Sequence, residues 1–97
     1  MDPAIPSIDI SDVVVSTAGR DRGEWFYVVS TEEAFLFLAN GKDRTLDKPK
    51  RKKRKHVEKV LRSETRVAEK LRSGDKVLNG ELRRDLAFLA RGMQAKT

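Results

Sequence analysis

Seven of the eight residues from Lys48 to Lys55 are lysine or arginine, and the remaining one is Pro49. So dense a cluster repels itself, and each cationic group keeps its hydration unless a polyanion lies opposite to compensate the charge. Pro49 has no backbone N–H to donate, so this segment belongs at the edge of a sheet or in extended chain rather than in a central strand. The run therefore predicts an exposed basic segment in the middle of the chain.

The net charge of +6 is unevenly distributed along the sequence. Residues 1–47 carry four basic and nine acidic side chains, residues 48–62 carry nine and one, and residues 63–97 carry eight and five. The pattern indicates a phosphate-rich partner, of which nucleic acid is the commonest, since neutralising its phosphates releases condensed counterions. A nuclear-import signal and a solvated linker are the alternatives for a run of this composition.

The chain has 97 residues, of which 38% are hydrophobic, and it has no cysteine. This length allows one small domain with a short helical unit appended to it. The lack of cysteine excludes disulfides, thiolate metal sites and thiol catalysis, and it suits a reducing compartment. Residues 1–6 have neither a basic start nor an apolar run, and no segment approaches the roughly 20 apolar residues of a membrane span. We therefore expect a cytoplasmic protein without a membrane partner.

The first half of the chain predicts β-strands joined by tight turns. Segments rich in β-branched and aromatic residues lie at 8–15, 25–29 and 34–39. A glycine-bracketed loop at 19–23 separates the first two, and the turn dipeptide Asn40-Gly41 follows the third. Thr45-Leu46 should begin a fourth strand that leads into the basic run. Apolar residues exceed strict alternation, so the turns and the short strand lengths favour β over buried helix.

The second half predicts two short helices. Ser63 is positioned to cap the first, which Gly74 ends, and Asn79 to cap the second, which runs over 80–91 and stops at Gly92. Apolar residues recur on one face of each, at Val67 and Leu71 and at Leu82, Leu86 and Leu89. Helices this short are marginal alone, so we expect them to pair and to pack on the β domain. The predicted division is a β domain at 1–60 and a helical extension at 61–97.

The residue types give little support for catalysis. The chain has one histidine, no cysteine and no phosphate-cradling glycine motif. A metal site is not predicted, because such sites need three or four clustered ligands, and no cofactor is expected. His56 could contact a base or a phosphate, or it could pack at the edge of the β domain.

Aromatic residues raise the question of base stacking. Trp25 and Tyr27 should share one side of their strand and Phe26 the other. We expect Phe26, Phe35 and Phe37 to belong to the core, with base contact by Trp25 or Tyr27 as a weaker alternative.

The glycine-bracketed loop contains two arginines, Arg20 and Arg22, on either side of Asp21. Guanidinium groups at this spacing suit bidentate contacts with phosphate, and glycine lets the backbone approach a ligand closely. In the alternative interpretation, Asp21 pairs with one of the arginines and makes the turn rigid. Both interpretations are compatible, since an oriented arginine is a better phosphate clamp.

Several of these segments together resemble a known family. The matching features are the turn Ala18-Gly19-Arg20-Asp21-Arg22-Gly23, the apolar strands that follow it, and the basic block that leads to Lys55-His56. Residues 10–60 resemble the KOW-domain ribosomal proteins of the L14e/L6e/L27e family, and most of all their short bacterial relatives, the KOW-domain RNA-binding proteins.

The resemblance implies a mainly β fold, a small SH3-like (KOW) barrel of five strands, here followed by the pair of short helices. It also implies that the turn and the basic segment face ribosomal RNA. The RNA-binding residues expected on this basis are Gly19, Arg20, Asp21, Arg22 and Gly23 of the turn, together with Lys48, Lys50, Arg51, Lys52, Lys53, Arg54, Lys55 and His56 of the basic segment.

The sequence therefore predicts a non-catalytic protein that binds structured RNA, with ribosomal RNA or a ribosomal subunit as partner. Phosphate contacts would set affinity, and the A-form shape would provide selectivity, because side chains cannot read the deep RNA major groove. Two alternatives remain. The module could dock on a protein through a strand edge, the helical pair or the acidic N-terminal half, or it could be linked to transcription and follow nascent RNA or polymerase.

Overall fold

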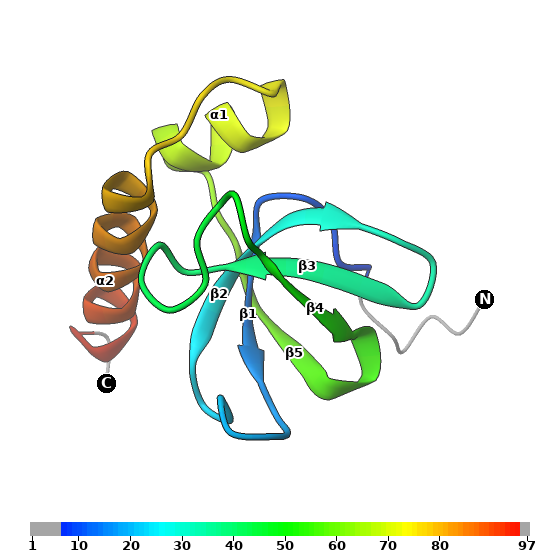
Figure 1. Cartoon of the computed structure of the whole chain (residues 1–97). Coiled ribbons are helices and arrows are strands. Elements are labelled where there is room, and N and C mark those ends of the chain that lie inside the picture. The colour runs from blue at the N-terminus through cyan, green and yellow to red at the C-terminus, as the bar shows by residue number, and fades with distance from the viewer. Residues whose placement is uncertain (1–6, 96–97) are drawn as a thin grey trace.

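The computed structural model describes residues 7–95, and the side chains of residues 7–92. It contains a five-stranded antiparallel sheet followed by two α-helices (Figure 1). The elements in chain order are β1 (Asp12–Ser16), β2 (Trp25–Thr31), β3 (Phe35–Ala39), β4 (Lys50–Lys53), the 3-10 helix η1 (Arg54–His56), β5 (Val57–Arg62), α1 (Arg66–Ser73) and α2 (Asn79–Ala95).

The strand order in the sheet is β4-β3-β2-β1-β5. The three strands predicted from the first half of the chain are confirmed, although the first begins only at Asp12. A turn precedes it, in which Ser11 has a φ of 77° and Ile8 enters the core while Ile10 stays exposed. The predicted fourth strand at Thr45-Leu46 is wrong, because these residues lie in the β3–β4 loop and the strand is formed by the basic run itself.

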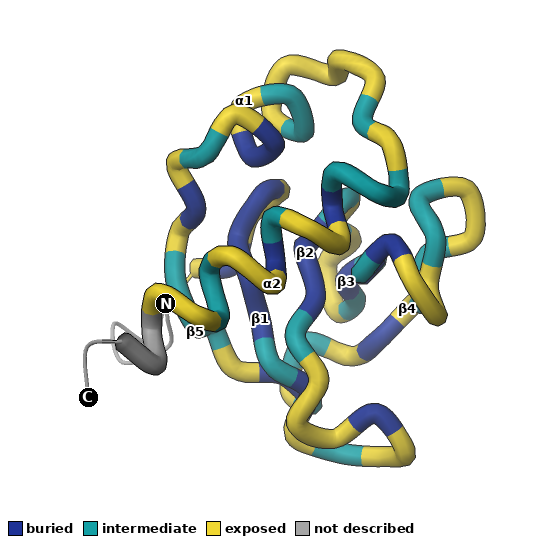
Figure 2. Tube along the Cα trace, turned by 90° about the vertical axis from the view of Figure 1, so that its left-hand side faces the viewer, coloured by how far each residue is buried: buried dark blue, intermediate teal, exposed yellow. Residues whose placement is uncertain are grey.

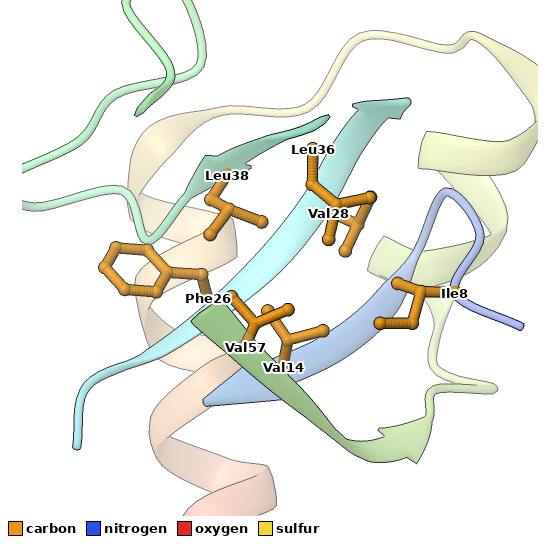
Figure 3. Packing of buried hydrophobic residues seen from close by; sticks show 7 residues of the cluster. All are labelled: Ile8, Val14, Phe26, Val28, Leu36, Leu38 and Val57. Carbon is orange, nitrogen blue, oxygen red and sulfur yellow. The ribbon is translucent and has the colours of Figure 1, made fainter. Parts of the chain in front are cut away.

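One core cluster lies on the face of the sheet that the helices do not cover, which we call the inner face (Figure 3). The opposite face is the outer face. Paired residues of neighbouring strands supply it, since Val14 lies opposite Phe26 and Val28 lies opposite Leu38. The members are Ile8, Val14, Phe26, Val28, Leu36, Leu38 and Val57. Burying side chains of this size contributes about 1.5–3 kcal/mol each, so this cluster stabilises the pairing of the strands.

A second cluster lies on the opposite face, between the sheet and the helices. Figure 2 shows α2 lying across the strands on this side. The fully buried members include Tyr27 and Leu82, and Trp25 packs against the cluster at its margin. Because both faces of the sheet are covered here, the strands carry more apolar residues than a one-sided alternation would require.

The aromatic residues are divided between the two faces. Trp25 and Tyr27 belong to the helix-covered side and Phe26 to the inner side, which confirms the predicted alternation. The expectation that Phe35 and Phe37 belong to the core is wrong, because both are only partly buried and neither is in a core cluster. They lie on β3 opposite Lys53 and Arg51 of the edge strand.

The helices are present where predicted, with corrections at their ends. Thr65, not Ser63, caps α1, and its side chain accepts a hydrogen bond of 3.2 Å from the backbone N–H of Ala68. Gly74 ends α1 in the left-handed conformation, as predicted. Gly92 does not stop α2, which continues to Ala95.

The start of α2 also differs from the prediction. The side chain of Asn79 accepts a hydrogen bond of 2.8 Å from Leu46 in the β3–β4 loop, so it anchors that loop instead of capping the helix. Glu81 accepts from the backbone N–H of Leu78, which is one half of a capping box. The predicted apolar faces are confirmed, because Val67, Leu82 and Leu86 are buried against the sheet, with Leu71 and Leu89 packed at the edge.

The two helices contact each other, and α2 also contacts β2. The predicted division of the chain at residue 60 falls inside β5, which ends at Arg62. No helix in the described part of the chain is both long enough and apolar enough to cross a membrane.

A buried polar junction joins the sheet to the helices. The Tyr27 hydroxyl donates to the Asp85 carboxylate of α2 and is hydrogen-bonded to Ser63 at 2.8 Å. Thr65 donates to the same carboxylate at 2.9 Å. Burial first, and then the hydrogen bond to Asp85, raise the pKa of Tyr27 to about 12. The Tyr27 hydroxyl of β2 therefore links the sheet both to α2 and to the segment that precedes α1.

This junction predicts a loss of stability at alkaline pH. The unfolded chain loses the Tyr27 proton near its ordinary pKa of 10.0, whereas the folded protein keeps it until about 12. The contribution is therefore complete below pH about 10 and falls by up to about 3 kcal/mol as pH rises further. Urea unfolding of the wild type and of Tyr27→Phe across this range measures the effect, which the variant should lack.

Because the chain has a single tyrosine, the absorbance of tyrosinate gives the midpoint directly. Ionisation of Tyr27 at its ordinary pH in the folded protein would contradict the buried junction.

Candidate nucleic-acid interface

The basic run forms β4 at the edge of the sheet, so its side chains alternate between two faces. Lys50 and Lys52 lie opposite Leu38 and Leu36, on the inner side. Arg51 and Lys53 lie opposite the partly buried phenylalanines of β3, on the outer side. The strand thus divides one continuous block of charge into two sets with different surroundings.

The inner pair of lysines is held by Asp21 of the β1–β2 turn. The Asp21 carboxylate lies 2.5 Å from the Lys50 ammonium and 2.7 Å from that of Lys52, and the Ser16 hydroxyl donates to it at 2.6 Å. Lys52 also donates to the backbone carbonyl of Ala18 at 2.7 Å. The Lys52 side chain is 7% exposed and that of Asp21 10%, so this is a buried ion-pair network.

The network changes the ionisation of Asp21. Burial alone would raise the pKa of this carboxyl group, but hydrogen bonds from Lys50, Lys52 and Ser16 outweigh burial and hold the pKa well below its usual range. Asp21 is therefore charged at any physiological pH. It joins the β1–β2 turn to the edge strand, and neither arginine of the turn is its ion-pair partner.

The β1–β2 turn presents Arg20 and Arg22 on the surface. Gly19 and Gly23 have φ values of 86° and 90°, a conformation that costs other residues energy. Backbone hydrogen bonds close the turn, from Gly23 to Ser16 at 2.8 Å and from Glu24 to Asp21 at 2.9 Å. Both arginine side chains are exposed, and neither forms a salt bridge within the described residues.

The 3-10 helix η1 lies between two turns of the sheet. The backbone N–H of Arg54 donates to Ala34 in the β2–β3 turn at 3.1 Å, and that of Thr17 in the β1–β2 turn donates to His56 at 2.9 Å. The Arg54 guanidinium donates to the backbone carbonyls of Glu32 and Ile8. Arg54 thus has a structural role, and η1 is fixed beside the arginine-bearing turn.

The structure therefore sorts the predicted binding residues by their surroundings. Lys52 and Asp21 are buried in the network, Lys50 is mostly covered by it, and Arg54 holds two backbone carbonyls. His56 is partly buried and contributes its backbone carbonyl to the junction with the turn. Of the predicted residues, the exposed cations that form no salt bridge within the described part of the chain are Arg20, Arg22, Lys48, Lys53 and Lys55.

Two features of this region were not predicted. Arg44 of the β3–β4 loop lies beside Arg20 and Lys50 around an open hollow of about 220 Å³, together with Glu24 and Asp43. The carboxylates of Glu24 and Asp43 would repel phosphate, so they limit the surface that can face RNA on this side. Arg51 lies over the ring of Phe35, with its guanidinium carbon 3.6 Å from the ring centroid. Neither neighbourhood can be inferred from local sequence, because both join segments that are distant along the chain.

No group of three or more histidine, cysteine or acidic side chains that could hold a metal ion occurs among the described residues. No protein-family model matches the sequence. No curated protein matches it either. Function must therefore be inferred from the residues and their geometry.

Proposed function

We propose that the protein binds structured RNA without catalysis, through a surface formed by the β1–β2 turn and the end of the basic segment. We name this surface the basic face and define it by Arg20, Arg22, Lys53 and Lys55. The observation that carries the proposal is that the Asp21 network and the Thr17–His56 hydrogen bond hold these two cationic segments side by side. Both segments leave their outermost cations free of salt bridges within the described residues.

A rigid array of cations suits a rigid array of phosphates. The cations of the basic face extend from a closed turn, from the end of β4 and from η1, not from a flexible tail. Little backbone must therefore be ordered when RNA binds. Double-stranded RNA presents its phosphates at fixed spacing and is recognised mostly by shape and backbone. Ribosomal RNA, or a ribosomal subunit in the cytoplasm, is the partner we propose on the strength of the KOW resemblance.

The fold proposed for the β domain is a partly open SH3-like (KOW) barrel. Three features support it: the strand order β4-β3-β2-β1-β5, the 3-10 helix between β4 and β5, and register shifts in the pairing of β1 with β5 and of β2 with β3. Such irregularities bend strands and increase twist, which helps a sheet to curve on itself. The Asp21 network joins edge strand β4 to the opposite side of this curve.

A second candidate function is docking on a protein. Phe88 of α2 is 60% exposed, and it borders an open hollow of about 280 Å³ between the helices, beside Arg66 and Arg84. A large exposed aromatic side chain is typical of contact surfaces. Nuclease treatment distinguishes the candidates, because a protein-held complex survives it and an RNA-held complex does not.

The salt dependence of binding tests the RNA proposal. Replacing Arg20, Arg22, Lys53 and Lys55 with glutamine is expected to flatten the slope of log K against log salt by about three units, at roughly 0.7–0.9 for each phosphate that is no longer neutralised. The assay is fluorescence anisotropy with a labelled RNA hairpin over a range of salt concentrations.

A matched variant controls for net charge. Glutamine at Arg66, Lys76, Arg83 and Arg84 removes the same four charges from exposed positions on the helical side. This variant should keep the wild-type slope within about one unit. Equal slopes for the two variants would refute the assignment of the basic face.

A further inference from the structure

The stacked pair of Arg51 and Phe35 lies on the outer face of the sheet, at the edge that the helices leave open. Arg51 belongs to edge strand β4, and its side chain is 54% exposed although its guanidinium covers the Phe35 ring. Glu32 accepts a hydrogen bond of 3.0 Å from Nε of Arg51. The guanidinium plane is thus backed by an aromatic ring on one side and oriented at its edge by a carboxylate.

An open hollow of about 390 Å³ adjoins this pair on the side of Phe35. It is lined by Ala34, Phe35, Lys53, Arg54 and Lys55. The hollow between the helices also combines an aromatic side chain with cations, but Glu81 and Asp85 line it too, whereas the hollow beside Phe35 has no acidic lining residue. Its two lysines, Lys53 and Lys55, also belong to the basic face, so an RNA bound there would pass directly over the hollow.

We propose that a single unpaired nucleotide of the bound RNA lies at this edge of the sheet, with its base stacked on the exposed Arg51 guanidinium, which Phe35 supports from behind, and with its backbone in the adjoining hollow. This inference rests on the proposed function and adds to it a preference for RNA with a bulged or looped-out base. Unpaired bases stack on aromatic rings and on arginine planes, and this stacking tolerates different bases. Lys53 and Lys55 are placed to bind the flanking phosphates.

The charge of the hollow selects this ligand over other flat or apolar groups. Lys53, Arg54 and Lys55, which line the hollow, repel a cationic ligand, as does the adjacent Arg51, and the phosphate on each side of a nucleotide supplies the complementary charge. A plain acidic peptide would use the lysines but would leave the stacked plane of Arg51 and Phe35 without a partner. A nucleotide uses both features.

The test compares two RNA hairpins that differ by one unpaired 2-aminopurine nucleotide in the stem. The wild-type protein is expected to bind the bulged hairpin about tenfold more tightly, within the range measured for base stacking on aromatic side chains, and to change the fluorescence of the 2-aminopurine as its base leaves the stack of the stem. Arg51→Lys retains the charge but loses the planar group, so it should abolish the preference and the fluorescence change while binding the uninterrupted hairpin normally.

Further variants keep the outcome interpretable. Phe35→Leu should reduce the preference in the same way, and Lys53→Gln should weaken binding to both hairpins about equally. Circular dichroism of each variant establishes that it is folded. If the wild type binds both hairpins equally, or if Arg51→Lys keeps the preference, this inference is overturned while the proposed function stands. If the wild type binds neither hairpin, the proposed function fails and this inference with it.

Discussion

Replacing Asp21 with asparagine is expected to lower the free energy of unfolding by about 3–5 kcal/mol. The substitution keeps the shape of the side chain but leaves the buried Lys52 ammonium without its counterion, and breaking a buried ion pair by removing one partner has a cost of this size. Lys50 is 25% exposed and can turn to solvent, so most of the loss arises at Lys52. Chemical denaturation followed by the fluorescence of the single tryptophan measures it.

A double-mutant cycle separates the part of this loss that comes from the interaction between Asp21 and Lys52 from the part that each substitution would cause independently. Lys52→Met leaves Asp21 with Lys50 and Ser16, so it should cost less than Asp21→Asn. The double variant should lose about 0.5–3 kcal/mol less than the sum of the single variants, because it contains no orphaned ammonium. Additive losses would show that Asp21 and Lys52 do not interact.

The same network predicts a dependence on acid. The pKa of Asp21 is depressed in the folded protein, so its stabilising contribution is complete above pH about 4 and is lost as pH falls below the ordinary range of a carboxyl group. As pH falls below about 4, the free energy of unfolding should therefore decrease less steeply in Asp21→Asn than in the wild type.

Replacing Gly41 with alanine is expected to cost about 2–5 kcal/mol. Gly41 has a φ of 77°, where a side chain costs roughly 1–2 kcal/mol, and an added Cβ would overlap the backbone carbonyl of Asn79 at the start of α2. Moving the β3–β4 loop away from the helix adds about 1–3 kcal/mol. Urea unfolding measures the total.

Gly23→Ala is the matched control for Gly41→Ala. Gly23 has a similar φ of 90°, but no atom lies within 4 Å of an added Cβ. It should therefore show only the backbone cost of roughly 1–2 kcal/mol. Equal losses at both glycines would mean that the β3–β4 loop does not pack against α2 as described.

The sequence predicted the local elements well because local signals encode them. Alternating β-branched runs, the positive-φ glycines of the β1–β2 turn and the glycine that ends α1 all act through a few neighbouring residues. Errors arose where a tertiary contact overrides a local preference. Ser63 has a capping side chain, but it is hydrogen-bonded to Tyr27, and Asn79 is bound to Leu46 across more than 30 residues.

The candidate site was predicted in location but not in its internal organisation. The charge run identified the segment and the glycines identified the turn. The choice of Lys50 and Lys52 as partners of Asp21, rather than Arg20 or Arg22, depends on the register of β4 against β3. The stacking of Arg51 on Phe35 depends on the same register. Pairing across a sheet is set by long-range packing, so no local pattern revealed either interaction.

Sedimentation of the protein in cell lysate over a sucrose gradient shows whether RNA holds it on a ribosomal particle. The wild type is expected to migrate with one ribosomal particle at low salt and to be released by RNase or by high salt. The variant with glutamine at Arg20, Arg22, Lys53 and Lys55 should stay at the top of the gradient, and the matched variant on the helical side should migrate as the wild type does. Migration of the wild type as a small free species at low salt would contradict the account, as would comigration that survives both RNase and the loss of the basic face.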